Sequence, residues 1–197
     1  MKNDTHPRLR SAVKFVALAN LVYFAVEFGV GLHIGSVSLI AGSVDFLEDA
    51  SVNFLILLAL GWSLKARARM GSGLAILLLI PDMTTLWMLW HKFNAFTPPD
   101  PVLLSIAGAG ALCVNLTCAF ILARYRHRGG SLIKAAFLSV RNDAFANIGI
   151  IVAGLLTVVI HSAWPDLILG IAIAAISMDS AKKVRAAAKA EHLETKS

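Results

Sequence analysis

The stretch SLIAGSVDFLEDASVNF, from Ser38 to Phe54, places three carboxylates within an otherwise apolar segment. Asp45 and Asp49 are four residues apart and therefore share one face of a helix, and Glu48 lies on the flank of that face. An acidic side chain at mid-bilayer costs roughly 2.5–3.5 kcal/mol on insertion scales, so such groups normally face a bundle interior or a water-filled cavity. Like charges this close also repel one another unless a cation or protons neutralise them. The stretch therefore predicts a polar site inside a membrane protein.

The composition indicates a membrane location for the whole chain. Of 197 residues, 57% are hydrophobic and 15% are charged, whereas soluble domains carry about 25% charged residues. A helical span needs about 20 mostly apolar residues. Six segments meet this requirement, at about residues 12–32, 37–64, 71–90, 102–122, 132–160 and 163–178. We expect an all-α integral membrane bundle of six transmembrane helices that forms a single domain over residues 1–197, with short cytoplasmic tails.

The basic residues predict the orientation of the chain. Sixteen of the 18 Lys and Arg residues fall at the same alternate ends of the expected spans, whereas Lys92 lies in an opposite loop and Arg141 lies within the fifth span. Because Lys and Arg are enriched in cytoplasmic loops, both termini should be cytoplasmic. The expected location is the lipid bilayer of a bacterial inner (cytoplasmic) membrane. The net charge of +6 follows from this bias, so no nucleic-acid partner is expected.

Acidic and polar side chains recur in other spans at similar depth. In the fifth span Ser139, Asp143 and Asn147 follow at intervals of four residues and form an oxygen-rich stripe on one helix face. Counted at about 1.5 Å per residue from the span ends, Asp45, Asp49 and Asp143 all lie near mid-depth. Two helices are therefore expected to bring carboxylates to one level of the membrane.

Five more polar residues are candidates for a proton or ion pathway. Asn20 and Glu27 are seven residues apart and share a face of the first span, and Asp82 follows a proline in the third span. Glu48 and Asn147 complete this set. The alternative for each residue is a structural role, as an interhelical hydrogen bond for the amides or a salt bridge for the acids.

The expected chemistry is that of a divalent cation. Asp45, Asp49 and Asp143 would supply charge, and Ser139 or Asn142 would complete an all-oxygen shell. Such a shell suits Mn²⁺ or Mg²⁺ and, with lower preference, Fe²⁺ or Co²⁺, whereas Zn²⁺ prefers imidazole or thiolate ligands. Because ligands must be deprotonated to bind, each metal ion would displace protons. The alternative interpretation of the three aspartates is a structural polar cluster between helices.

Longer patterns in the sequence resemble a known family. The run N-x6-E-x8-S-x-x-L, formed by Asn20, Glu27, Ser36 and Leu39, is followed by the D-x3-D pair and then by NDAFANIGIIVAGL. From about Ala19 to Asp179 the chain resembles the membrane domain of the cation diffusion facilitator (cation efflux) family. The resemblance implies a secondary transporter, usually a homodimer, whose six helices export Zn²⁺ or a related divalent ion in exchange for protons.

The resemblance also implies a ligand set. In the family, the second and fifth helices each give two metal ligands four residues apart. The matching positions here are Asp45 and Asp49 on the second helix, and Ser139 and Asp143 on the fifth. Zinc exporters of the family usually carry His at one or both leading positions, where this chain has Asp45 and Ser139. The choice among zinc, cobalt and manganese therefore stays open.

Further expectations concern assembly and the class of function. The family's cytoplasmic C-terminal domain is not expected in this chain, so a homodimer would be held together by transmembrane helices. The alternative function is that of a degenerate member acting as a non-transporting membrane binding or scaffold protein. An enzyme is not expected, because the sequence has no Gly-rich phosphate cradle and no nucleophile beside a base. No cofactor is expected, since the divalent cation would be a transported substrate.

Overall fold

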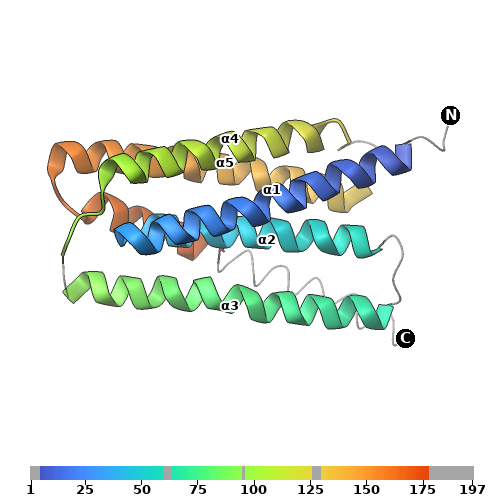
Figure 1. Ribbon diagram of the computed structural model, residues 1–197, viewed down its shortest axis with the longest axis horizontal. Coiled ribbons are helices and arrows are strands. Elements are labelled where there is room, and N and C mark those ends of the chain that lie inside the picture. Colours follow the sequence, from blue (N-terminus) through green and yellow to red (C-terminus); the bar gives the residue numbers. More distant parts are fainter. Residues whose placement is uncertain (1–4, 60–63, 95, 126–129, 178–197) are drawn as a thin grey trace.

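The computed structural model describes residues 5–59, 64–94, 96–125 and 130–177. Within these ranges the regular secondary structure is entirely helical. The helices are α1 (Thr5–Ile34), α2 (Val37–Ala59), α3 (Leu64–Asn94), α4 (Pro101–Ala123), α5 (Gly130–Ile160) and an unlabelled final helix, Trp164–Ser177 (Figure 1). The all-α fold predicted from the apolar segments is confirmed.

Several helices extend beyond the apolar segments that predicted them. α1 begins at Thr5 rather than near residue 12, and α3 runs from Leu64 to Asn94 rather than from 71 to 90. The apolar run marks the part suited to hydrocarbon, whereas the backbone hydrogen bonds of a helix can continue into polar flanks. Residues 60–63 of the second expected span and residue 178 of the sixth lie outside the described residues.

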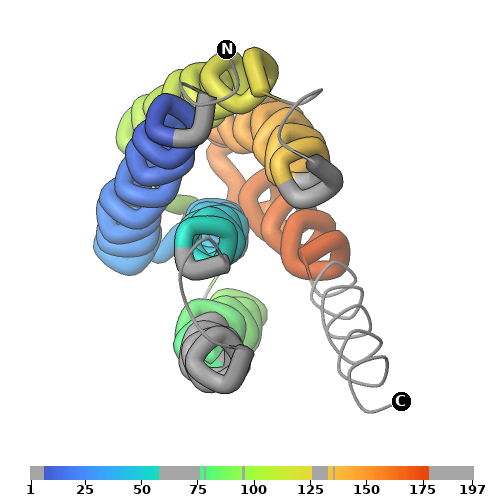
Figure 2. Tube along the Cα trace, turned by 90° about the vertical axis from the view of Figure 1, so that its right-hand side faces the viewer, coloured from blue at the N-terminus to red at the C-terminus, as the bar shows by residue number. Residues whose placement is uncertain are grey.

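α2 occupies the centre of the bundle. Seen end-on, α1, α4, α5 and the final helix form an arc around α2, and α3 lies on the remaining side (Figure 2). α2 packs against α1, α3 and α5, and less extensively against α4. This position explains how a helix with three carboxylates is accommodated, since its polar residues can face protein instead of lipid.

The turn between α1 and α2 sets the entry of this central helix. Gly35 adopts a left-handed conformation with φ 65°, which glycine reaches without steric cost. The backbone N–H of Ser36 then donates to the Gly31 carbonyl at 2.9 Å, as in a Schellman motif. α1 therefore ends sharply, and α2 begins antiparallel to it after two intervening residues.

The outer surface of the bundle suits a bilayer. Three of the described helices contain segments long and apolar enough to cross a membrane, namely Pro7–Ile34, Pro101–Ala123 and Ala136–Ile160, and Trp164–Ser177 is a shorter apolar helix. Large apolar side chains on several helices are exposed, among them Phe120, Val159 and Ile176. This is an integral membrane bundle, in which exposed apolar side chains face lipid.

Among the buried apolar clusters of the described residues, two lie at different levels of the bundle. The first joins α1, α2, α4 and α5 through Val13, Val16, Ile56, Cys118, Leu122, Ile133, Ala136 and Val140. The second joins α2, α4, α5 and the final helix through Leu39, Ala41, Leu104, Ala107, Ile150 and Ile173. Along α1, α2 and α5, most of the polar residues predicted from the sequence fall between the two clusters, and Ser139 lies beside Val140 of the first.

Candidate metal site

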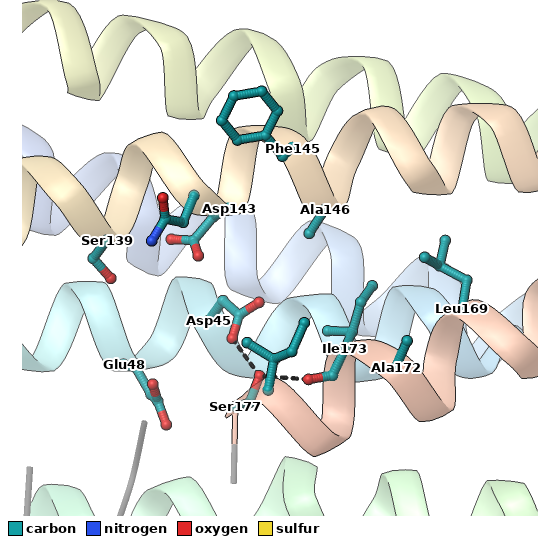
Figure 3. A pocket seen from close by; sticks show the side chains of 12 residues that line it. Asp45, Glu48, Ser139, Asp143, Phe145, Ala146, Leu169, Ala172, Ile173 and Ser177 are labelled. Carbon is teal, nitrogen blue, oxygen red and sulfur yellow. Dashed lines mark hydrogen bonds between the residues drawn. The ribbon is translucent and has the colours of Figure 1, made fainter. Parts of the chain in front are cut away.

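An acidic cavity of about 560 Å³ lies between α2, α5 and the final helix (Figure 3). α2 contributes Asp45 and Glu48, and α5 contributes Ser139, Asn142 and Asp143. The rest of the lining comes from α5 and the final helix: Phe145, Ala146, Leu169, Ala172, Ile173, Ile176 and Ser177. Five of the residues proposed from sequence as ligands or pathway groups therefore share one cavity.

Asp45 is held by a hydroxyl of the final helix. Ser177 Oγ lies 2.6 Å from Asp45 Oδ1, to which it donates, and 3.1 Å from the carbonyl oxygen of Ile173 (Figure 3). The sequence analysis did not single out Ser177. The sequence shows a hydroxyl near the end of the sixth apolar segment. The acid that it contacts lies 132 positions away in the chain, so the sequence alone does not indicate this contact.

Asp49 is buried and does not line the cavity. Its side chain is 3% exposed, and its Oδ2 atom has no hydrogen-bond partner among the described residues. The carboxyl group also lies within hydrogen-bonding reach of the side chains of Ser139 and Asp143 on α5. The predicted meeting of the α2 and α5 residues therefore takes place around Asp49.

The carboxylates do not form a closed coordination shell. Within the described part of the chain, no three His, Cys, Asp or Glu side chains converge closely enough to hold a metal ion. Asp45 is instead turned to Ser177, while Asp49 approaches Asp143. Binding a cation would thus require the carboxylates to move closer together, and the Ser177 hydroxyl competes for one oxygen of Asp45.

The donor atoms present fit a hard divalent cation. The acids contribute carboxylate oxygens, and Ser139 and Ser177 contribute hydroxyl oxygens. Asn142 is the least suited of the predicted ligands, because it is exposed and its Oδ1 atom accepts from Arg141 Nη2 at 3.4 Å. Asp82 of α3 is near enough to Asp45 and Glu48 to act on both electrostatically. The cavity and its surroundings are therefore rich in acidic side chains.

The remaining pathway residues lie inside the bundle instead of lining the cavity. Asn20, Glu27 and Asn147 are all buried. Asn20 Nδ2 donates to the Val16 carbonyl at 3.0 Å, but Asn20 Oδ1, both oxygens of Glu27 and Asn147 Nδ2 have no partner among the described residues.

Asp166 is a further buried acid, which was not predicted as functional from the sequence. Its carboxylate forms a 2.9 Å salt bridge with Lys92 of α3 and accepts hydrogen bonds at the start of α2 from Ser36 Oγ, Val37 N, Ser38 N and Ser38 Oγ. An anion at a helix N-terminus satisfies free backbone N–H groups and suits the helix dipole. Asp166 therefore joins α2, α3 and the final helix at one end of the bundle.

Fold and site together define a polytopic membrane protein with an acidic cavity among its helices. The chain belongs to the cation efflux family, because the family's sequence model for the cation efflux transmembrane domain matches residues 13–184. The expected family is confirmed.

Curated relatives include zinc transporters named ZitB. The protein from Pectobacterium atrosepticum is 25% identical over 196 residues, which cover 91% of this chain and 60% of the relative. The one from Yersinia pestis is 26% identical over 186 residues, with 84% of this chain and 57% of the relative covered. The chain thus spans about 60% of the length of the curated relatives it matches.

Proposed function

We propose that this chain is a secondary transporter that exports divalent metal cations across a bacterial inner membrane in exchange for protons. The supporting observation is the acidic cavity between α2, α5 and the final helix, with buried Asp49 beside it. The zinc transporters among the relatives make Zn²⁺ the first substrate to test. Co²⁺ and Mn²⁺ are further candidates because the donor atoms are oxygens.

Asp45, Asp49 and Asp143 are the proposed metal ligands. Three carboxylates near one another can balance the charge of a divalent ion and replace much of its hydration shell. Ser139 is the proposed neutral ligand, because it lines the cavity and its side chain approaches Asp49. Asn142 stays a weaker candidate, and Glu48 would attract the cation as it enters.

Proton exchange follows from the same cluster. Without a cation, adjacent buried carboxylates repel one another, and protons relieve this repulsion. A metal ion that binds displaces those protons, so an inward proton gradient can drive the metal outwards if the site opens to each side in turn. The proposed assembly is a homodimer through transmembrane helices, in line with the resemblance to the family, and both termini would be cytoplasmic.

A non-transporting scaffold remains the second candidate function. It is favoured by one observation, that no three metal-binding side chains among the described residues converge. A scaffold needs the bundle but not a closed metal site. Transport itself must therefore be measured.

Flux in proteoliposomes tests the proposal. The purified full chain would be reconstituted, and Zn²⁺, Co²⁺ and Mn²⁺ movement followed with a metal-sensitive dye under an imposed pH gradient. We expect metal flux that rises with the gradient and falls when a protonophore dissipates it. Asp45→Asn should lose the flux, whereas Asp100→Asn, at an exposed helix cap, should keep it. Folded wild-type protein that moves none of the three ions would favour the scaffold.

A further inference from the structure

A set of buried polar residues, called the polar layer from here on, lies in the interior of the bundle. We define it by six buried residues from four helices: Asn20, Glu27, Asp49, Asn53, Asn115 and Asn147. Each is at most 3% exposed. Of these, only Asp49 belongs to the metal site proposed above.

The layer contains every buried side-chain atom found without a hydrogen-bond partner among the described residues. These atoms are Asn20 Oδ1, Glu27 Oε1, Glu27 Oε2, Asp49 Oδ2, Asn53 Oδ1, Asn115 Oδ1 and Asn147 Nδ2. A buried polar group left unpaired costs about 1–3 kcal/mol, so native proteins pair such groups with protein atoms, water or ions. Unpaired atoms on four helices of the bundle indicate positions suited to water, protons or ions.

Glu27 is the clearest case within the layer. It is 0% exposed, and neither carboxyl oxygen has a partner. Tyr23, one turn away on α1, is no donor to it, because its hydroxyl donates to the Ala107 carbonyl at 2.6 Å. On the other side, α2 comes so close at Gly42 that an added Cβ would lie 3.3 Å from Glu27 Oε1. Glu27 therefore lies against the backbone of the helix that carries Asp45 and Asp49.

The charged surroundings of Glu27 are acidic. α1 packs against α2 and α4. From α2, the ionisable neighbour that acts on Glu27 is Asp45. From α4, Cys113 acts on Tyr23 instead of Glu27. The buried ion pair found in the described part of the chain joins Lys92 to Asp166 and does not include Glu27. A bare carboxylate at Glu27 would thus be buried beside a like charge without a counterion, which is strongly unfavourable.

We propose that Glu27 is a proton-binding site outside the metal shell, loaded when the metal site is empty and released when a divalent cation binds. This inference rests on the proposed function. The proton leaves the Glu27 carboxyl group, which becomes a carboxylate, and goes to solvent. The new negative charge is attracted by the cation that has arrived near Asp45. The unpaired amide atoms of the layer are polar groups at which water can carry the proton.

Proton release on metal binding tests the proposal. Zn²⁺ would be titrated by calorimetry into the purified full chain in detergent, in buffers of different ionisation enthalpy, which gives the protons released per Zn²⁺ bound. Glu27→Gln should still bind Zn²⁺ but release about one proton fewer than wild type. The control Asp100→Asn should match wild type. Equal proton release by Glu27→Gln and wild type would overturn the proposal, whereas a wild type that binds none of Zn²⁺, Co²⁺ and Mn²⁺ in the same titration would overturn the proposed function itself.

Infrared difference spectroscopy gives a readout that does not need the glutamine variant to fold. In wild type, Zn²⁺ should remove a carbonyl band of a protonated carboxylic acid. In Glu27→Asp, which keeps an acid on a shorter stem, the lost band should shift in frequency. If the band is absent from wild type, or is unmoved in Glu27→Asp, Glu27 is not the group that releases the proton.

Discussion

Asp166 and Asp49 are both buried acids of the same bundle, but their surroundings are opposite. Asp166 receives five donor groups, including the Lys92 ammonium. Asp49 lies beside a second acid, Asp143, and keeps one oxygen without a partner among the described residues. Burial alone therefore does not identify a functional acid. A carboxylate saturated by fixed donors stabilises the fold, whereas one left unsatisfied near other acids suits a variable occupant.

The largest expected effect is the loss of transport when the unsatisfied acids are removed. Asp49→Ala and Asp143→Ala should each abolish metal flux, because each removes charge that the cation needs. Both variants should remain folded in the membrane, since each substitution also removes a like-charge repulsion. Metal resistance of a sensitive host would be compared at equal expression. Resistance equal to wild type from both variants would refute the proposed site.

Removing the carboxylate of Asp166 should lower the stability of the fold instead of acting directly on transport. Asp166→Ala leaves the Lys92 charge buried and unpaired, which should cost about 3–5 kcal/mol. Thermal unfolding of the detergent-purified chain measures the effect. Asp49→Ala serves as the matched comparison and should unfold close to the wild-type temperature. If Asp166→Ala unfolds no earlier than Asp49→Ala, the contrast between the two acids is wrong.

A smaller effect is expected at Ser139, where the metal preference should change. Ser139→His would add an imidazole one helical turn from Asp143, and imidazole favours Zn²⁺ over Mn²⁺. We expect the ratio of Zn²⁺ to Mn²⁺ flux to rise about tenfold, equivalent to about 1.4 kcal/mol. Both ions would be measured in the same vesicles under a fixed pH gradient. A wild type that already strongly prefers Zn²⁺, together with an unchanged ratio in the variant, would exclude the oxygen-donor explanation.

The smallest effect concerns the hydroxyl that holds Asp45. Ser177 competes with the metal for this carboxylate, and a hydrogen bond contributes about 1 kcal/mol net. Ser177→Ala should therefore tighten metal binding by about fivefold. Calorimetric titration of wild type and variant with Zn²⁺ checks the sign. Weaker binding would mean that Ser177 is itself a ligand.

The sequence predicted the helices well because each one is encoded locally. Runs of apolar residues located the helices, and the spacing of Asp45, Asp49, Ser139 and Asp143 placed each pair on one helix face. Asn147 shows the limit of this reasoning. It continues the stripe of Ser139 and Asp143 in sequence, yet it lies buried within the bundle while they line the cavity.

Contacts between distant helices were not predictable from spacing. The Ser177 hydroxyl meets Asp45 across 132 positions, and Lys92 meets Asp166 across 74. Helical periodicity determines which residues share a face but not which helix that face meets. Asp166 differs from Asp49 in the number of hydrogen-bond donors that other helices supply to it. Only the three-dimensional arrangement reveals this difference.

The Asp166 network also has a mechanical consequence, because it fastens the start of α2 to α3 and the final helix. A helix held at one end moves like a lever. α2 has 23 residues, so its far end lies roughly 33 Å from the fastened end and Asp45 roughly 12 Å from it, at about 1.5 Å per residue. A tilt of about 10° would shift the far end by roughly 6 Å but Asp45 by only roughly 2 Å, from the same dimensions. Fastening at one end would thus let the opposite mouth of the bundle widen while the carboxylates keep nearly the same spacing.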